Sequence, residues 1–450
     1  MVVKKKHEVD MLTGPILPRA LEFAFQLMLS SLLQLLYNAA DIVVVGRFAG
    51  PQALAAVGST GSLAGLIVNA FMGLSTGASV LVARHYGGGR QDKVHKTVHS
   101  SMTLALICGT VVSILGLLLS GKMLRWMDSP PDVLPLATQY LQIYFMGSIA
   151  NLVYNFGAGI LRAIGDTKRP LYYLAFSGLV NVLLNLVLVI VFHMGAAGVG
   201  IATVASQVIS AVLVVMALLK ADSCYRLDLR ELCFDLDSIR DILVIGVPTG
   251  LQSVLFSLSN VLIQSTINSF GSTVIAGNSA GANLEGFLWV VDSAFAQTCM
   301  TFCSQNLGAG KTERLDPILH TCLLWSGLAQ AALSIGALLI GDSLIGFYST
   351  EPQVVAMGLI RIGCTFPLYF TTALMETASG FLRGMGRSFQ AMLISLAGVC
   401  GLRILWLYTV FPMNPTLETL YISYPVSWAV TALAHYLYSR VLKREMARKV

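Results

Sequence analysis

Polar side chains recur at every turn of an apolar segment near the N-terminus, and the last of them is an acid. Their spacing of three or four residues places them on one face of an α-helix. A carboxylate among apolar residues is costly unless it binds a proton or a cation. Asp41, with Asn38 one turn away, is therefore a candidate for binding H⁺ or Na⁺. Within residues 16–46 the full set of polar side chains on this face is Glu22, Gln26, Ser30, Gln34, Asn38 and Asp41.

Two later apolar segments carry neutral oxygen ligands at helical spacing. Asn181 and Asn185 lie within 171–193, and Thr203 lies within 197–219. Na⁺ requires several oxygen ligands, which the acid and these three residues would supply if their helices meet. A proton requires only the acid, so the single carboxylate favours H⁺ and leaves Na⁺ open. The alternative for the amides is hydrogen bonding between packed helices, which is common in membrane proteins.

The second half of the chain also carries acids in apolar segments. Such an acid suits recognition of an organic cation, and an aromatic ring beside it adds to the attraction. The alternative is a structural role between packed helices. Arg383 lies two turns from Glu376, so these two side chains are expected to pair only through water or a neighbouring residue. We predict a site for a cationic compound formed by Asn260 and Gln264 of segment 242–268, Glu285, Trp289 and Asp292 of segment 274–305, and Glu376 of segment 354–382.

Other chemistries lack their motifs in this sequence. The histidines do not have the pattern of zinc ligands, and Gly87-Gly88-Gly89 is not followed by the Lys-Ser/Thr of a phosphate-binding loop. The eight cysteines lack CxxC spacing and are expected to be buried thiols. The basic residues do not form a face for nucleic acid. We expect no enzymatic activity, no nucleic-acid partner and no cofactor other than the coupling ion, H⁺ or Na⁺.

The composition indicates that these residues belong to a membrane protein. Only 12% of the 450 residues are charged and 55% are hydrophobic, whereas soluble chains carry about 25% charged residues. The stretch from Leu171 to Leu219 has no Asp, Glu, Lys or Arg and is too long for one crossing of a ~30 Å hydrocarbon core. The sequence thus predicts an all-α integral membrane protein with twelve transmembrane helices at 16–46, 53–84, 97–120, 134–161, 171–193, 197–219, 242–268, 274–305, 318–341, 354–382, 390–411 and 418–441.

The distribution of basic residues predicts the orientation of these helices. Most of the 29 Lys and Arg residues fall on one side of the predicted membrane. Arg47, Lys122 and Arg125 fall on the other side, and Arg361 and Arg403 lie within predicted spans. The positive-inside rule then places both termini in the cytoplasm, with the protein crossing the plasma membrane several times.

The chain divides into two halves that repeat one another. The polar segment 220–241 is predicted to be a cytoplasmic linker between a six-helix lobe at 1–219 and a second lobe at 242–450. The heptapeptide Gly159–Gly165 recurs as Gly380–Gly386, 221 residues further along. A repeat at a fixed offset indicates two copies of one structural unit. Because each half has an even number of helices, the two bundles are expected to be related by a pseudo-two-fold axis along the membrane normal.

Three segments resemble a known transporter family. Gln305–Arg314 (QNLGAGKTER) and Leu382–Gly386 (LRGMG) resemble signatures of the multidrug and toxic compound extrusion (MATE) family. Asp41–Gly46 (DIVVVG) is similar to the DinF-like branch of that family. The resemblance implies two V-shaped lobes and a secondary antiporter that exports organic, often cationic, compounds in exchange for H⁺ or Na⁺ by alternating access.

The resemblance also implies roles for individual residues and partners. The family's N-lobe cation site maps onto Asp41, with Asn181, Asn185 and Thr203 as its neighbours. The implied partners are small organic substrates and the lipid bilayer, with the protein as a monomer. A lipid-linked oligosaccharide flippase of the same superfamily is the main alternative and would require a more basic central cavity. A membrane-embedded enzyme is a further alternative, but no catalytic cluster is found in the sequence.

Overall fold

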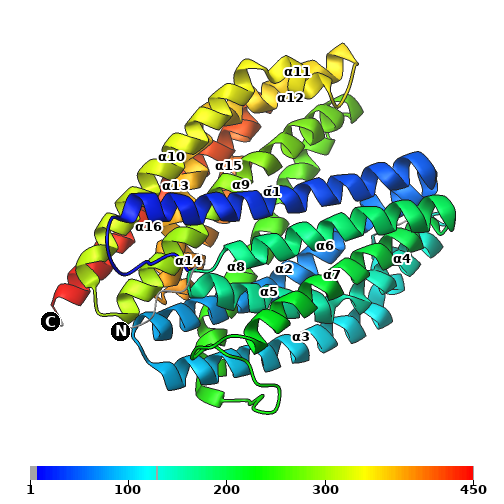
Figure 1. The fold of residues 1–450 in the computed structure, drawn as a ribbon. Coiled ribbons are helices and arrows are strands. Elements are labelled where there is room, and N and C mark those ends of the chain that lie inside the picture. Colours follow the sequence, from blue (N-terminus) through cyan, green and yellow to red (C-terminus); the bar gives the residue numbers. More distant parts are fainter. Residues whose placement is uncertain (1–7, 128–129, 449–450) are drawn as a thin grey trace. The chain divides into compact units, whose positions relative to one another are not determined.

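The computed structural model describes residues 8–127 and 130–448. Over this part of the chain the structure consists of helices joined by turns and loops, and it contains no strand (Figure 1). The all-α fold predicted from the sequence is confirmed.

Seven α-helices and one π-helical segment form the first half of the chain. The helices that carry Phe156, Ile160 and Val214 share an apolar core in which these three residues are fully buried. The elements are α1 (Ile16–Phe48), α2 (Pro51–Gly87), α3 (Gln91–Trp126), α4 (Leu134–Met146), α5 (Ser148–Ala163), α6 (Lys168–Leu186), η1 (Val187–Val191) and α7 (Gly195–Leu219).

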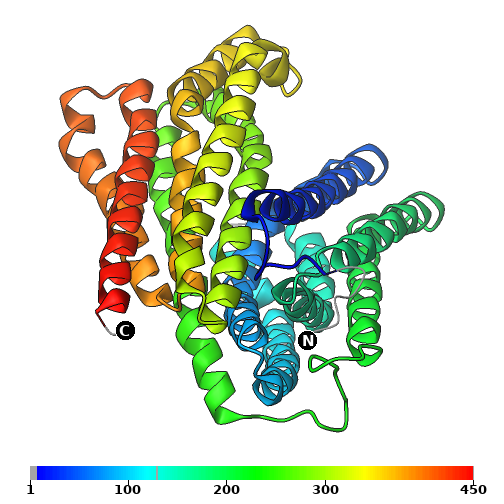
Figure 2. The same cartoon turned by 60° about the vertical axis from the view of Figure 1, so that its left-hand side comes forward.

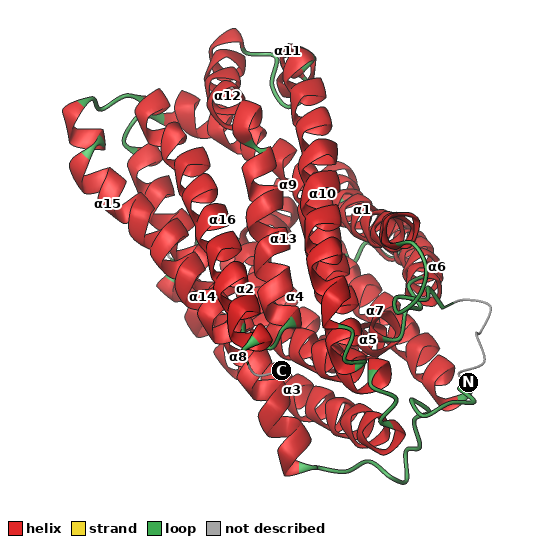
Figure 3. Cartoon of the chain, turned by 90° about the vertical axis from the view of Figure 1, so that its left-hand side faces the viewer, coloured by secondary structure: helices red, strands yellow, loops and turns green. Residues whose placement is uncertain are grey.

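Among the described residues the second half has the same succession of long helices, with two additional short α-helices, Gly341–Gly346 and Leu402–Thr409. Figure 3 shows the helices and the loops that join them. The elements are α8 (Leu236–Asn268), α9 (Ser272–Gly308), η2 (Thr312–Arg314), α10 (Leu315–Leu339), α11 (Gly341–Gly346), α12 (Pro352–Thr365), η3 (Phe366–Leu368), α13 (Phe370–Gly384), α14 (Ser388–Ser395), η4 (Leu396–Gly401), α15 (Leu402–Thr409), η5 (Phe411–Met413) and α16 (Leu417–Ala447).

Contacts within the chain divide it into two compact units. The N-terminal unit comprises the described residues 8–10 and Leu29–Gly250, and the C-terminal unit comprises 11–28 and 251–448. The division therefore does not fall at the linker predicted at 220–241. Instead α1 and α8, each 33 residues long or about 50 Å, contribute residues to both units.

The turns of the two halves confirm the internal repeat. Three glycines with positive φ in the first half each have a counterpart with positive φ in the second half, at the same offset of 221 residues. In this region of backbone space a Cβ atom is disfavoured, so the position requires glycine. The matching pairs are Gly50 and Gly271, Gly89 and Gly310, and Gly165 and Gly386. The three turns therefore occupy equivalent positions in the two halves.

Several predicted spans are interrupted helices. The span predicted at 134–161 is broken at Gly147, between α4 and α5. Its counterpart at 354–382 is broken at η3, where Pro352–Leu368 and Phe370–Gly384 meet at 52°. Among the described residues, eight helices are long and apolar enough to cross a membrane, or nine with this bent pair. The broken pair of α4 and α5 and the long but less apolar helices α9 (37 residues) and α16 (31 residues) complete two pseudo-symmetric bundles of six spans.

The linker between the halves is the green loop at the lower edge of Figure 2, and its backbone N–H groups bond His99 and Ser100 near the start of α3. The backbone N–H of Asp228 donates to His99 Nε2 at 3.0 Å, and Tyr225 is fully buried. Asp235 then begins α8, because its carboxylate accepts a hydrogen bond from the backbone N–H of Ser238 at 2.9 Å. The hydroxyl of Ser238 and then its backbone N–H lower the pKa of Asp235 by hydrogen bonding to the carboxylate. The linker is therefore a fixed part of the N-terminal unit.

The backbones of α9 and α13 pack closely, and a substitution can test this contact. A Cβ atom added at Gly380 would lie 2.4 Å from the backbone oxygen of Ala296. Because backbone cannot give way as a side chain does, Gly380→Ala should destabilise the C-terminal unit by about 1–3 kcal/mol. The matched control is Gly336→Ala in α10, where a Cβ would meet nothing within 4 Å. Thermal unfolding in detergent should show a lower midpoint for Gly380→Ala alone, and equal midpoints would contradict this reading.

Candidate functional site

The N-terminal unit brings together the acid and the neutral residues predicted from the sequence. Asn185 Nδ2 donates to Asp41 Oδ1, and Thr203 Oγ1 donates to Asp41 Oδ2 at 3.4 Å. Asn185 Nδ2 also lies 3.2 Å from Asn181 Oδ1. Asn181 and Asn185 are buried, whereas Asp41 is half-buried. Helices α1, α6 and α7 therefore meet at one carboxylate that is contacted by neutral donors.

A cavity of about 110 Å³ lies beside this carboxylate. Asn38 lies on its wall, one turn before Asp41, as predicted. Two buried acceptor atoms, Asn185 Oδ1 and Gln207 Oε1, have no hydrogen-bond partner among the described residues. Of these two residues, Gln207 lines the cavity, so its side-chain oxygen can accept a hydrogen bond from water or bind a cation there. The full lining is Gln34, Tyr37, Asn38, Asp41, Asn151, Tyr154, Asn155, Leu174, Ser177, Gly178, Asn181, Thr203, Ser206, Gln207 and Ser210.

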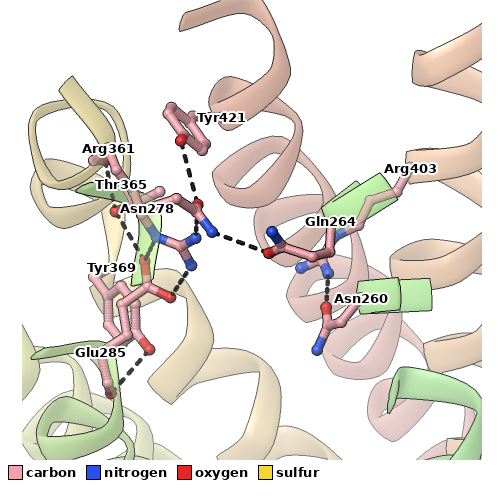
Figure 4. Close-up of polar contacts among 9 residues, drawn as sticks. All are labelled: Asn260, Gln264, Asn278, Glu285, Arg361, Thr365, Tyr369, Arg403 and Tyr421. Atoms are coloured by element: carbon pink, nitrogen blue, oxygen red, sulfur yellow. Dashed lines mark hydrogen bonds and ion pairs between the residues drawn. The ribbon is translucent and has the colours of Figure 1, made fainter. Parts of the chain in front are cut away.

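A second polar cluster lies in the C-terminal unit and is centred on an ion pair (Figure 4). Arg361 Nε donates to Glu285 Oε1 at 2.9 Å, and Arg361 Nη2 donates to Glu285 Oε2 at 2.7 Å. Thr365 Oγ1 also donates to Glu285, at 3.4 Å. The remaining Arg361 nitrogen, Nη1, donates to Asn278 Oδ1, which accepts from Tyr421 as well. Glu285, predicted to attract a cation, is thus neutralised by an arginine of the same chain.

The cluster continues along α8 to a second arginine (Figure 4). Gln264 Oε1 accepts from Asn278 Nδ2 at 3.0 Å. One turn earlier, Asn260 Oδ1 accepts from Arg403 Nη1 at 3.1 Å. Arg403 Nε donates to Ser427 Oγ at 3.0 Å. Asn260 and Gln264 therefore belong to this cluster, as predicted, but their partners include a base instead of an acid.

The other predicted residues of the cargo site lie apart from this cluster. Asp292 is fully buried, accepts a hydrogen bond from Thr372 and has no partner for Oδ1 among the described residues. Glu376 accepts from Arg383 Nη2 at 3.1 Å. The expectation that this pair would need water or a neighbour was wrong, because a helical side chain leans toward the N-terminus and a long arginine spans two turns. Trp289 is 46% exposed and makes no hydrogen bond to Glu285.

Three residues of the second cluster have no role predicted from the sequence. Arg361 and Arg403 are only bases within predicted spans, and Asn278 lies seven residues before Glu285 on the same line of its helix. Their signal was present, because a charged residue within an apolar span is functional by default. What the sequence did not contain was the pairing, which depends on contacts between helices far apart in the chain.

A family comparison agrees with the fold and the repeat. Residues 27–187 and 248–409 match the sequence model of the MatE family. The chain belongs to the MatE family. The two matched segments coincide with the two halves of the repeat, so the MatE assignment covers both units.

Individual proteins are similar to this MatE chain over nearly its full length. A probable multidrug resistance protein, YoeA of Bacillus subtilis, is 24% identical, with 95% of each chain covered. A FAD transporter of Shewanella oneidensis is 24% identical over 88% of this chain and 87% of its own. The solved outward-facing conformation of a multidrug resistance MATE family transporter superposes with a TM-score of 0.91 at 21% identity, covering 99% of this chain and 100% of that chain. The protein is thus a multi-pass membrane transporter of the MATE multidrug efflux family.

Proposed function

We propose that this chain is a secondary antiporter that exports small organic compounds in exchange for H⁺ bound at Asp41. The observation that supports this proposal is a single carboxylate, beside a cavity between membrane-spanning helices, whose hydrogen-bond partners are Asn185 and Thr203. Because these partners are neutral, the site changes charge when one proton is bound or released. A family relative named for multidrug resistance supports export as the direction of transport.

The hydrogen-bond directions around Asp41 favour H⁺ over Na⁺. Asn185 Nδ2 presents a hydrogen atom to the carboxylate, whereas the single hydroxyl hydrogen of Thr203 is shared between Asp41 Oδ2 at 3.4 Å and the backbone oxygen of Val199 at 2.9 Å. A bound Na⁺ would require oxygens in these places, so the Asn185 amide would have to turn its Oδ1 inward. A proton requires no such rearrangement. Na⁺ is therefore the alternative coupling ion of the same antiporter.

The setting of the proposed antiporter follows from the sequence and the family. We propose a location in the plasma membrane with both termini cytoplasmic, according to the positive-inside rule, and a monomer as the working unit. The coupling ion is the only cofactor. The flippase alternative is not favoured, because the two relatives described above are named for drug resistance and FAD transport.

The cationic cargo predicted from the sequence stays a prediction. That prediction depended on free carboxylates in the second half of the chain. Glu285 and Glu376 are each bonded to an arginine, which removes most of their attraction for a cation. The charge of the cargo therefore depends on residues other than those proposed to bind the coupling ion.

Gradient-driven transport tests the proposed function. We expect purified protein in sealed proteoliposomes to move at least one of three compounds, the cation ethidium, norfloxacin and the anion flavin mononucleotide, when a pH gradient is imposed in the absence of Na⁺. A proton ionophore should abolish this transport. Protein-free liposomes are the control for passive movement. Transport that follows a Na⁺ gradient and ignores pH would reassign the coupling ion, whereas transport driven by neither gradient would contradict antiport itself.

A further inference from the structure

The cluster in the C-terminal unit contains one more base than acid. Arg361 and Arg403 are 5% and 4% exposed. Within the described part of the chain, Glu285 is paired with Arg361, while no carboxylate forms an ion pair with Arg403. The hydrogen-bond acceptors of Arg403 are the neutral oxygens of Ser427 and Asn260. With Glu285 ionised, the cluster carries one net positive charge among membrane-spanning helices, which is costly without a counter-ion.

The surroundings of Arg403 hold the guanidinium in a defined orientation. Its central carbon lies 4.2 Å from the ring centroid of Tyr424 and 5.7 Å from that of Trp428. A planar guanidinium stacked on a ring presents its N–H groups at the edge, which suits an oxyanion. Arg403 Nη2 makes no hydrogen bond with a described residue. The fixed arginine therefore retains donor capacity for a ligand.

An exposed amide connects Arg403 to the surface of the C-terminal unit. Asn260, the partner of Arg403, is exposed. A polar amide at membrane depth is unfavourable against lipid, so an exposed Asn260 indicates a surface in contact with water. Asn268, two turns further along α8, is exposed as well and accepts from Gln264 at 2.8 Å. A polar ligand would reach Arg403 along this face of α8.

The two units carry opposite charges on equivalent helices. At the repeat offset of 221 residues, α8 corresponds to α1, and α14 with its continuation α15 corresponds to α6. In the N-terminal unit the contact between these helices joins an acid, Asp41, to the amide of Asn185. In the C-terminal unit a contact between the corresponding helices, at different positions along them, joins the amide of Asn260 to a base, Arg403. The same architecture thus provides a cation site in one unit and a positively charged site in the other.

We propose that Arg403, together with Asn260 and the neighbouring Arg361, binds the oxyanion group of a small organic compound, such as a phosphate, carboxylate or sulfonate. This inference rests on the proposed export function and assigns an anionic cargo class in place of the cation expected from the sequence. The oxyanion would supply the missing counter-charge. Glu285 holds Arg361 in position and neutralises one of the two arginines, so the site has a net charge of one positive unit.

A matched pair of flavins tests the proposed site. Riboflavin and flavin mononucleotide (FMN) share one ring system and differ by a phosphate group. In equilibrium dialysis with purified protein, we expect FMN to bind at least ten times more tightly than riboflavin. Competition by inorganic phosphate would identify a general oxyanion site, and its absence would identify a site that also requires the organic part. Equal affinities for the two flavins would overturn the proposal.

Variants of Arg403 and Glu285 separate ligand recognition from folding. Arg403→Gln should reduce FMN affinity at least tenfold, and Arg403→Lys, which keeps the charge, should reduce it less. Arg47→Gln removes one exposed base in the N-terminal unit and should leave FMN binding unchanged. Glu285→Gln should preserve or tighten FMN binding, because it removes the competing negative charge. Wild-type FMN affinity in Arg403→Gln, or loss of FMN binding in Glu285→Gln at unchanged thermal stability, would overturn the proposal.

The failure of this inference can be distinguished from failure of the proposed function. If a pH gradient drives ethidium transport but FMN does not bind through Arg403, the anion site is wrong and the antiporter stands. If FMN binds through Arg403 but no ion gradient drives transport of any compound, the site stands and the antiporter is wrong.

Discussion

Asp41→Asn should fold normally and lose gradient-driven export, by at least tenfold relative to the wild type. The amide keeps the size of the carboxylate and still offers an oxygen to Asn185 Nδ2, while the Thr203 hydroxyl can turn to accept from the new amide nitrogen. What the variant lacks is a group that gains and loses a proton. Efflux of ethidium from proteoliposomes under an imposed pH gradient measures the loss.

The control for this variant is an acid outside the site. Asp342→Asn in α11 changes the same functional group at an exposed position and should export like the wild type. Equal thermal midpoints of both variants in detergent would show that the Asp41 substitution did not disturb folding. Wild-type efflux in a well-folded Asp41→Asn protein would remove Asp41 from the coupling mechanism.

The sequence predicted the N-terminal site because each of its residues carried a local signal. Asp41 is an acid in an apolar helix, and Asn181 and Asn185 repeat at one-turn spacing. Such periodicity defines a helical face without knowledge of the tertiary fold. The repeat at a fixed offset also defined the two bundles. Convergence of the three helices on one carboxylate required the structure, because spacing along a helix does not specify which helix lies opposite.

The same reasoning predicted the wrong charge for the second site. Glu285 is an acid in an apolar helix like Asp41, so the two positions look equivalent in sequence. Arg361 is 76 residues away along the chain and lies on a helix that is bent at η3, and only tertiary packing brings it to Glu285. The charge of a buried site is a sum over several helices. A single acidic position therefore predicts a polar site but not its net charge.

Breaking the Glu285–Arg361 pair should produce the largest loss of stability among these substitutions. The guanidinium bonds both carboxylate oxygens and Asn278, and its side chain is only 6% exposed. Arg361→Met would leave Glu285 half-buried with Thr365 as its remaining side-chain donor. Removing one partner of a buried ion pair costs about 3–5 kcal/mol. The midpoint of thermal unfolding in detergent should fall accordingly, together with the yield of folded protein.

A double substitution separates the cost of an unpaired charge from the strength of the pair. Arg361→Met combined with Glu285→Gln leaves no charged group at either position, so most of the lost stability should return even though the ion pair is absent. Full recovery would mean that the pair contributes little net stability and instead fixes the position of Arg361 beside the proposed anion site. In that case the double variant should unfold like the wild type but bind FMN more weakly. A double variant as unstable as Arg361→Met alone would mean that the arginine acts mainly through packing against Tyr421 and Tyr424, and the electrostatic account of this cluster would be wrong.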